Sequence, residues 1–194
     1  MANIVRKGYG QVEPNHLSGI VTGQIYAQLP AVNITTTGEG ANAVTTETPI
    51  AQLEQGQFAK YNYAEGVVDF GSQDGEFMLV YNEEKLYDER RQAHKDFVYK
   101  ATDFTDGKLY PRLIKTNVGD IYTTNCIAVA NTDADAEVTI GTDATLVVGA
   151  YLAPSASTGF LTVGAKPASG MAWKIVKVYT MPDGQPGFKL QRVQ

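Results

Sequence analysis

Two stretches of this chain carry the same spacing of leucine, glycine and apolar residues. In each, a leucine stands three residues before a glycine, an aromatic residue follows that glycine by two, and a second glycine follows it by ten. Apolar residues then alternate, which is the pattern of a strand with one buried face. The spacing predicts two β-hairpins, each with its second glycine closing the turn. The matching positions are Leu53, Gly56, Phe58, Gly66, Val68 and Phe70, and then Leu146, Gly149, Tyr151, Gly159, Leu161 and Val163.

This repeated spacing has two interpretations. Duplication of an ancestral unit would produce it, and so would two similar hairpins in one β protein. The chain has 19 glycines in 194 residues. About two glycine pairs at this distance are expected by chance, so only the leucine and aromatic matches add weight. On the sequence alone, two similar hairpins are the simpler interpretation.

Residues 51–194 read as one β domain, an antiparallel sandwich or barrel. The run at 76–81 is almost continuously apolar, which predicts a central strand. Turn residues predict that 97–101 pairs with 108–115, with Pro111 at an edge or a bulge. They predict a second hairpin from 173–179 and 188–193 at the C-terminus. Further strands are expected at 121–130 and 136–140.

Residues 1–50 differ in composition from the rest of the chain. Glu39 is the only charged side chain between Asn15 and Thr46, and threonine and glycine are frequent. Large apolar residues are too few to build a core. We therefore expect an extended N-terminal arm that lies against its own β domain or against a neighbouring subunit. Its apolar anchors are Tyr9, Val12, Leu17, Ile20, Val21, Ile25, Tyr26 and Leu29.

A charged segment interrupts the β pattern. Residues 83–96 hold nine charges in fourteen positions, which predicts a short helical or loop insertion. One interpretation is a solvated connection. The other is a docking lobe, in which Arg90 and Arg91 would pair with charges of a partner and set the register of the contact.

The composition argues against several classes of protein. The formal net charge is −5 and the sequence pI is about 5.0, whereas a general nucleic-acid binder needs a basic surface. No apolar run approaches the roughly 20 residues of a membrane span, and residues 1–8 lack the apolar core of a signal peptide. A single cysteine, Cys126, excludes an internal disulfide and a multi-cysteine zinc site. Synthesis in a reducing cytoplasm fits these features.

No arrangement of residues predicts catalysis. His16 and His94 have no nucleophile nearby in the sequence, and no serine lies in a Gly-x-Ser-x-Gly turn. Cys126 lies in an apolar run and is expected to be a small buried hydrophobic residue. The alternating carboxylates at 133–137 could bind a cation weakly or form a solvated hairpin tip, and they lack the glycine and distant glutamate of an EF-hand. We predict no catalytic residue, no cofactor and no metal, and a protein that is not an enzyme.

Four segments resemble head proteins of tailed bacteriophages. They are 8–18 (GYGQVEPNHLS), 22–30 (TGQIYAQLP), 53–68 (LEQGQFAKYNYAEGVV) and 117–125 (NVGDIYTTN). They resemble in particular the capsid decoration proteins, which are small β proteins bound to the outside of the shell. The resemblance implies a virion structural protein that decorates and stabilises a phage capsid by binding the major capsid protein lattice. It would be made in the host cytoplasm and would lie on the capsid exterior.

The resemblance also implies the partners. These are the major capsid protein and neighbouring copies of the chain, as a homotrimer if capsid symmetry is the guide. No nucleic acid and no membrane are expected. Deleting residues 1–30 should then leave a folded domain that no longer joins capsids. The predicted docking residues are Tyr9, Val12, Leu17, Ile25, Tyr26, Leu29, Arg90 and Arg91.

Two other functions stay open. The first is a carbohydrate- or receptor-binding β module of a head fibre or tail, for which eleven tyrosines and one tryptophan offer stacking surfaces. The second is a hydrolase whose catalytic residues come together only in space.

Overall fold

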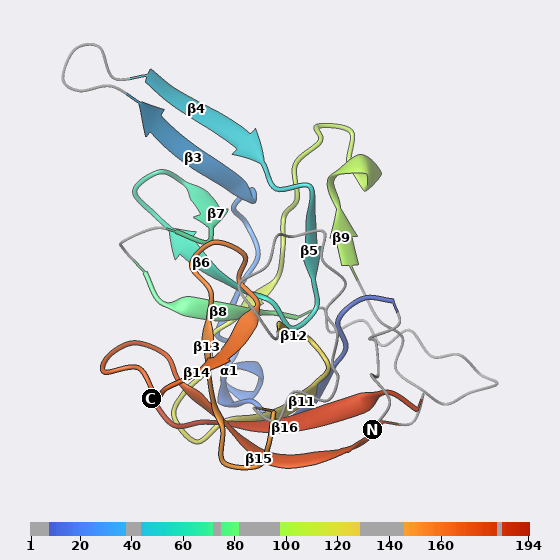
Figure 1. Cartoon of the computed structure of the whole chain (residues 1–194). Helices are drawn as coiled ribbons and strands as arrows, with labels where there is room; N and C mark the ends of the chain where they lie inside the picture. The colour runs from blue at the N-terminus through green and yellow to red at the C-terminus, as the bar shows by residue number, and fades with distance from the viewer. Residues whose placement is uncertain (1–7, 38–43, 72–74, 82–97, 129–145, 182–183) are drawn as a thin grey trace.

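The computed structural model describes residues 8–37, 44–71, 75–81, 98–128, 146–181 and 184–194, whose arrangement Figure 1 shows. This part of the chain is mainly β, with several antiparallel sheets, as predicted. Its two large sheets are open, so these residues form a sandwich-like fold and not a closed barrel. Within it, helical structure is limited to α1 (Ser18–Val21) and a 3₁₀ turn, η2 (Ala101–Asp103). In the described ranges, no helix is long and apolar enough to cross a membrane.

The strands form two large sheets and two smaller pairs. The larger sheet consists, in spatial order, of β1 (Val12–His16), β11 (Ile121–Thr124), β16 (Pro186–Arg192), β15 (Trp173–Thr180), β13 (Tyr151–Pro154), β14 (Leu161–Gly164) and β12 (Ile127–Ala128). The second sheet consists of β2 (Ile25–Tyr26), β10 (Leu113–Ile114), β8 (Phe77–Val80), β6 (Phe58–Asn62) and β7 (Val67–Asp69). The two pairs are β3 (Val32–Thr37) with β4 (Val44–Pro49), and β5 (Gln52–Glu54) with β9 (Val98–Lys100).

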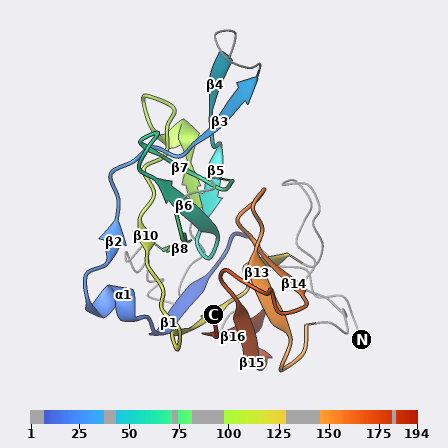
Figure 2. The same cartoon turned by 90° about the vertical axis from the view of Figure 1, so that its left-hand side faces the viewer.

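Buried apolar side chains lie on both faces of the five-stranded sheet. Side chains alternate along a strand, so Phe58 and Leu79 belong to one cluster while Ala59 and Val80 belong to another. The first cluster packs against the seven-stranded sheet, where the Trp173 ring lies 5.8 Å from the Phe58 ring. The five-stranded sheet is therefore the middle layer, with the seven-stranded sheet on one side and the β5–β9 pair and the base of β3–β4 on the other (Figures 1 and 2).

The five-stranded sheet and five strands of the larger sheet are two copies of one unit. In chain order, the first unit runs β2, β6, β7, β8, β10 and the second runs β11, β13, β14, β15, β16. Their spatial orders are the same: β2-β10-β8-β6-β7 in the first and β11-β16-β15-β13-β14 in the second. The second unit carries β1 and β12 as additional edge strands. The repeated hairpins of the sequence, β6–β7 and β13–β14, are one part of this unit.

Equivalent positions keep the same register and the same backbone hydrogen bonds. The Gly56 N–H donates to the Val80 carbonyl oxygen at 2.9 Å, and the Gly149 N–H donates to that of Ile175 at 2.8 Å. Both glycines have a φ of 98°, which other residues rarely adopt. This agreement across five strands favours duplication of one unit over two independent hairpins. The equivalent pairs include Ile25 and Ile121, Tyr26 and Tyr122, Lys60 and Ala153, Asp69 and Thr162, and Leu113 and Leu190.

The two units stack in the same orientation, so equivalent faces meet different surroundings. Phe58 and Leu79 of the first unit are buried against the second unit. Their equivalents, Tyr151 and Lys174, are only half-buried on the outer face of the seven-stranded sheet. The outer face of the last unit in such a stack is polar because it meets solvent, as is the outer face of a terminal repeat in a solenoid protein. This difference in burial explains why few residues outside the hairpins match between the two halves.

Tyr122→Phe is expected to leave the free energy of unfolding unchanged or to raise it by about 1 kcal/mol. The Tyr122 hydroxyl is fully buried, and no described protein group hydrogen-bonds to it. Burial raises the pKa of Tyr122 well above its usual value. An unfolded tyrosine ionises near pH 10, so this residue's contribution is complete below that pH and is lost as the pH rises further. Urea unfolding at pH 8 and pH 10.5 should therefore show a smaller alkaline loss in the variant, and an equal loss in both proteins would contradict this.

Several predictions from the sequence are confirmed. The two repeated hairpins form, the C-terminal hairpin forms as β15–β16, and the apolar run at 76–81 contains the central strand β8. Cys126 is completely buried, as expected for a small hydrophobic residue. The pairing of 97–101 with 108–115 is wrong, because β9 pairs with β5 while β10 lies between β2 and β8. Pro111 consequently precedes an inner strand and does not mark an edge.

The first two strands of the described chain each pair with an edge of one large sheet. Strand β1 pairs with β11 in the seven-stranded sheet, and β2 pairs with β10 in the five-stranded sheet. Of the two positions expected for the predicted arm, against its own domain or against a neighbour, the described residues occupy the first. Within the described ranges, the outer part of the β3–β4 pair extends away from the two large sheets (Figures 1 and 2). The predicted strand 136–140 and the predicted insertion at 83–96 lie outside the described residues.

Candidate functional site

Two surface features stand out in the described part of the chain. One is the β3–β4 ribbon, and the other is a polar groove at its base. The ribbon pairs Val32–Thr37 with Val44–Pro49 in antiparallel register, and every residue of β4 is exposed. A two-stranded ribbon has no core of its own, and the side chains of β4 face solvent.

The base of the ribbon is firmly anchored. The Val68 N–H donates to the Pro30 carbonyl oxygen at 2.8 Å, and the Ile50 N–H donates to that of Ala31 at 3.1 Å. Ala31 and Val32 are completely buried at the point where the ribbon leaves the body. The ribbon is therefore a rigidly attached projection.

The predicted docking residues at the start of the chain lie against the protein's own core. Val12 and Leu17 are each 3 % exposed and belong to the cluster between the sheets. Ile25 packs partly buried against the same cluster. Tyr26 and Leu29 pack against the cluster on the opposite face of the five-stranded sheet. This placement corrects the prediction for Val12 and Leu17, because side chains so deeply buried offer almost no surface to another subunit.

The remaining predicted docking residues are Tyr9, Arg90 and Arg91. The Lys100 ammonium group lies 5.2 Å from the centre of the half-buried Tyr9 ring, a cation–π contact within the chain. Arg90 and Arg91 lie outside the described residues, as do the alternating carboxylates at 133–137.

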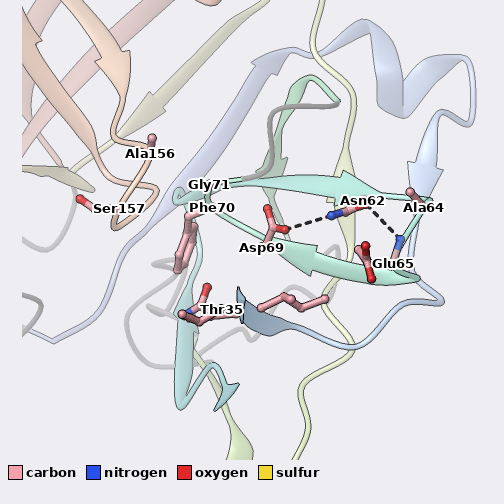
Figure 3. A pocket seen from close by; sticks show the side chains of 11 residues that line it. Thr35, Asn62, Ala64, Glu65, Asp69, Phe70, Gly71, Ala156 and Ser157 are labelled. Carbon is pink, nitrogen blue, oxygen red and sulfur yellow. Dashed lines mark hydrogen bonds between the residues drawn. The ribbon is translucent and has the colours of Figure 1, made fainter. Parts of the chain in front are cut away.

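The polar groove has a volume of about 630 Å³. Three elements form its walls: β3, the β6–β7 hairpin with the residues that follow it, and the turn between β13 and β14 (Figure 3). A second cavity of about 360 Å³ adjoins it, because Asn33, Phe70 and Ser157 line both. The groove thus lies where the ribbon, the first unit and the second unit meet.

Hydrogen bonds hold the β6–β7 wall of the groove. The Asn62 side-chain amide donates to the Asp69 carboxylate at 3.4 Å, and its oxygen accepts from the Glu65 N–H at 3.2 Å (Figure 3). Asp69 is 7 % exposed although its side chain lines the groove. These contacts fix the turn and orient the carboxylate.

The second unit supplies the opposite wall through a turn that is also held in place. The Ser155 hydroxyl lies 2.9 Å from that of Ser157, and the Gly159 N–H donates to the Ser155 carbonyl oxygen at 2.8 Å. The turn docks on the first unit, because the Phe58 N–H donates to the Gly159 carbonyl oxygen at 2.8 Å and the Gln57 amide donates to that of Thr158 at 2.9 Å. The relative position of the two walls is therefore set by the stacking of the units.

A charged cluster at the junction of the units is saturated with internal contacts. Lys115 and Arg192 occupy equivalent positions in the two units and both pair with the Glu76 carboxylate. The Arg192 guanidinium also donates to the backbone and hydroxyl oxygens of Thr116 and to the Gln194 carbonyl oxygen. With its donors used in this way, Arg192 is a structural residue and not a candidate for anion binding.

Among the described residues, no group of three or more His, Cys, Asp or Glu side chains could hold a metal ion. Sequence reasoning missed the groove because β3, β7 and the second hairpin turn are far apart in the chain. No local sequence pattern indicates that these three segments meet.

No known protein family, curated protein or solved structure matches this chain.

Proposed function

We propose that this protein is a virion structural protein that decorates and stabilises a phage capsid by binding the lattice of the major capsid protein. The resemblance of the sequence to decoration proteins motivates the proposal, and the β3–β4 ribbon supports it. Attachment to a lattice needs a rigid body with a projecting element that reaches a neighbour. The ribbon is such an element, and it replaces the N-terminal arm as the proposed clasp.

Strand addition is the contact that the ribbon suits best. An exposed strand edge presents N–H and carbonyl groups to an extended segment of a partner, and proteins usually protect such edges. The side chains of β4 are threonine, valine, glutamate and proline, and all are exposed. Threonine and valine favour strands, so the edge keeps its extended form. Repetition over a symmetric shell would multiply a modest contact through avidity.

The register shows which backbone groups of β4 face outward. The Ile50 N–H donates to the Ala31 carbonyl oxygen, so these two residues form a bonded pair at the ribbon base. Bonded and non-bonded pairs alternate in an antiparallel ladder. Pro49 pairs with Val32 at a non-bonded position, as its missing N–H requires, and Glu47 pairs with Ile34 at the next one. The Glu47 N–H therefore points away from β3, toward a partner strand.

Glu47→Pro is expected to reduce capsid occupancy at least tenfold while leaving the ribbon intact. Proline removes the outward N–H and places its ring at the edge, but it disturbs no hydrogen bond inside the ribbon. The measurement is co-sedimentation of the purified protein with empty shells of the phage that carries this chain, with the copy number per shell determined at saturation. A wild-type copy number that matches the capsid lattice is expected.

Glu47→Ala is the matched control. It removes the same carboxylate, and with it the exposed ion pair with Lys108 at 3.4 Å, but keeps the backbone N–H. Exposed ion pairs contribute little, so this variant should bind like the wild type. Full occupancy of Glu47→Pro would refute strand addition at β4, and absence of wild-type binding would refute capsid decoration itself.

A further inference from the structure

We infer that the polar groove at the base of the ribbon binds a neutral saccharide, an activity separate from attachment to a capsid. The groove combines an enclosed carboxylate, amides, hydroxyls and apolar surface in a volume of about 630 Å³. Small-molecule sites in proteins have volumes of roughly 300–1,000 Å³ and a few fixed polar groups. A second cavity of about 360 Å³ adjoins the groove, because Asn33, Phe70 and Ser157 line both.

The polar groups of the groove suit hydroxyl groups. A sugar hydroxyl both donates and accepts a hydrogen bond, so its site needs acceptors and donors side by side. Asp69 and Glu65 supply carboxylate acceptors, while Asn33 and Thr35 supply an amide and a hydroxyl that both donate and accept. Asn62 orients Asp69, because its side-chain amide bonds to that carboxylate. Bonds to an ionised carboxylate are about twice as strong as neutral ones, which makes Asp69 the expected anchor.

The apolar groups of the groove suit the C–H face of a sugar ring. Ile34 is half-buried in the lining, and Phe70, which is 7 % exposed and belongs to the core on that face of the five-stranded sheet, contributes a small part of its ring. Figure 3 shows Phe70 beside the Asp69 carboxylate and across from Thr35, so one ligand could contact all three. Both walls are held by the hydrogen bonds described above, and a preformed site loses less conformational entropy on binding.

The charge of the lining argues against other ligands. The described lining residues include two carboxylates and no lysine, arginine or histidine. A phosphate, a sulfated glycan or a sialylated glycan would meet repulsion without a compensating cation. The lining therefore combines carboxylate acceptors with amide and hydroxyl donors, and its described residues carry no positive charge. A neutral saccharide satisfies both kinds of group.

Comparison of the two units shows that the two carboxylates of the groove, Glu65 and Asp69, have no charged equivalent in the second unit. At the positions equivalent to Asn62, Glu65, Asp69 and Phe70, the second unit has Ser155, Thr158, Thr162 and Val163. The same backbone therefore accepts smaller, uncharged side chains at these places. The Thr162 hydroxyl donates to the Ala153 carbonyl oxygen at 3.2 Å. Lys60 is the strand partner of residue 69, as Ala153 is of Thr162. A threonine at position 69 could therefore donate to the Lys60 backbone carbonyl oxygen.

The test begins with the purified full-length protein on an array of neutral, sialylated and sulfated oligosaccharides. Binding to one or more neutral hexose or N-acetylhexosamine structures is expected, followed by titration of the best binder in solution. Asp69→Thr should weaken that affinity at least tenfold. Glu65→Thr, at an exposed position, should weaken it severalfold and serves as a second variant that leaves the fold undisturbed.

Asp103→Thr is the matched control, because it makes the same chemical change at an exposed site outside the groove. Its affinity should equal that of the wild type. The inference is overturned if no neutral saccharide binds at millimolar concentration, if sialylated or sulfated structures are preferred, or if both Asp69→Thr and Glu65→Thr keep wild-type affinity. Capsid co-sedimentation is measured separately, so failure here leaves the proposal on capsid attachment unaffected.

Discussion

Gly159→Ala is expected to lower the free energy of unfolding by about 3–5 kcal/mol, whereas Gly66→Ala should cost only about 1–2 kcal/mol. The two glycines occupy equivalent positions in the two units and have nearly the same backbone conformation, with φ of 72° and 69°. Both substitutions therefore carry the same cost of placing a Cβ in the left-handed region. They differ only in what surrounds the new methyl group.

At position 159, the methyl group has no room. An added Cβ would lie 2.2 Å from the Phe58 carbonyl oxygen and 2.7 Å from Cε1 of the Phe70 ring. At position 66, no atom of the described residues lies within 4 Å of the added Cβ. Relief of the clash at 159 would break the Phe58–Gly159 hydrogen bond, which docks the second unit on the first. The variant should lose contact between the units as well as stability.

The single tryptophan makes this comparison measurable. Trp173 is fully buried between the sheets, with the Tyr122 ring 4.8 Å and the Phe58 ring 5.8 Å from its own. Urea unfolding followed by its fluorescence reports separation of the two units directly. Equal losses of stability in Gly159→Ala and Gly66→Ala would show that close packing at 159 contributes nothing.

Deletion of residues 1–30 is expected to abolish the cooperative unfolding transition. This reverses the prediction from composition that the remaining chain would stay folded. The deletion removes edge strands from both sheets and two buried apolar side chains, Val12 and Leu17. Burial of such side chains stabilises a protein by about 1.5–3 kcal/mol each.

The deletion would also remove hydrogen-bond donors from buried polar side chains. Asp120 is 2 % exposed, and its carboxylate accepts hydrogen bonds from the Ser18 N–H and hydroxyl, both at 3.0 Å. Glu54 accepts from the Gly10 N–H at 2.9 Å, and Asn125 accepts from the Gln11 N–H at 2.8 Å. Loss of a hydrogen bond costs about 0.5–1.5 kcal/mol, and about 1.5–3 kcal/mol where one group is charged. Together with the lost apolar burial, the total is comparable with a typical stability of about 5–15 kcal/mol.

Removal of the outer ribbon is the control for this deletion. Asn33 and Thr48 form a bonded pair by the alternation of the ladder, so replacement of residues 34–47 by Asn-Gly would close a two-residue hairpin there. This protein should unfold cooperatively with little loss of stability, because the exposed part of the ribbon covers no core. Circular dichroism and urea unfolding distinguish the two variants, and a folded, cooperative 31–194 fragment would contradict the expectation.

The hairpins could be predicted because their signals are local. Alternation of apolar residues at Val68 and Phe70, with glycine at the turn, depends only on neighbours in the chain. The failed hairpin at 97–101 and 108–115 had an equally good turn signal. In the structure, however, β9 pairs with β5, and β10 pairs with β2 and β8. Strand partners depend on packing over the whole sheet and not on the turn alone.

The groove could not be predicted for the same reason. Its Asp69 and Asn62 lie on one hairpin, but Thr35 and Ser157 come from segments far away in the sequence. Only the stacking of the units brings these side chains together. The composition of residues 1–50 likewise predicted an extended arm, because it holds too few large apolar residues to build a core. It did not indicate that Val12 and Leu17 would be buried in the core of the whole fold.

The amino-acid sequence by itself determined the β class, the two repeated hairpins and the positions of their turns, since glycine conformation and side-chain alternation act within a few residues. The tertiary structure decided that each hairpin belongs to a five-stranded unit and that the units stack in one orientation. It also decided that the chain's first strands close both sheets. These outcomes depend on which surfaces meet, and burial of apolar area is a property of the whole fold that no local pattern contains.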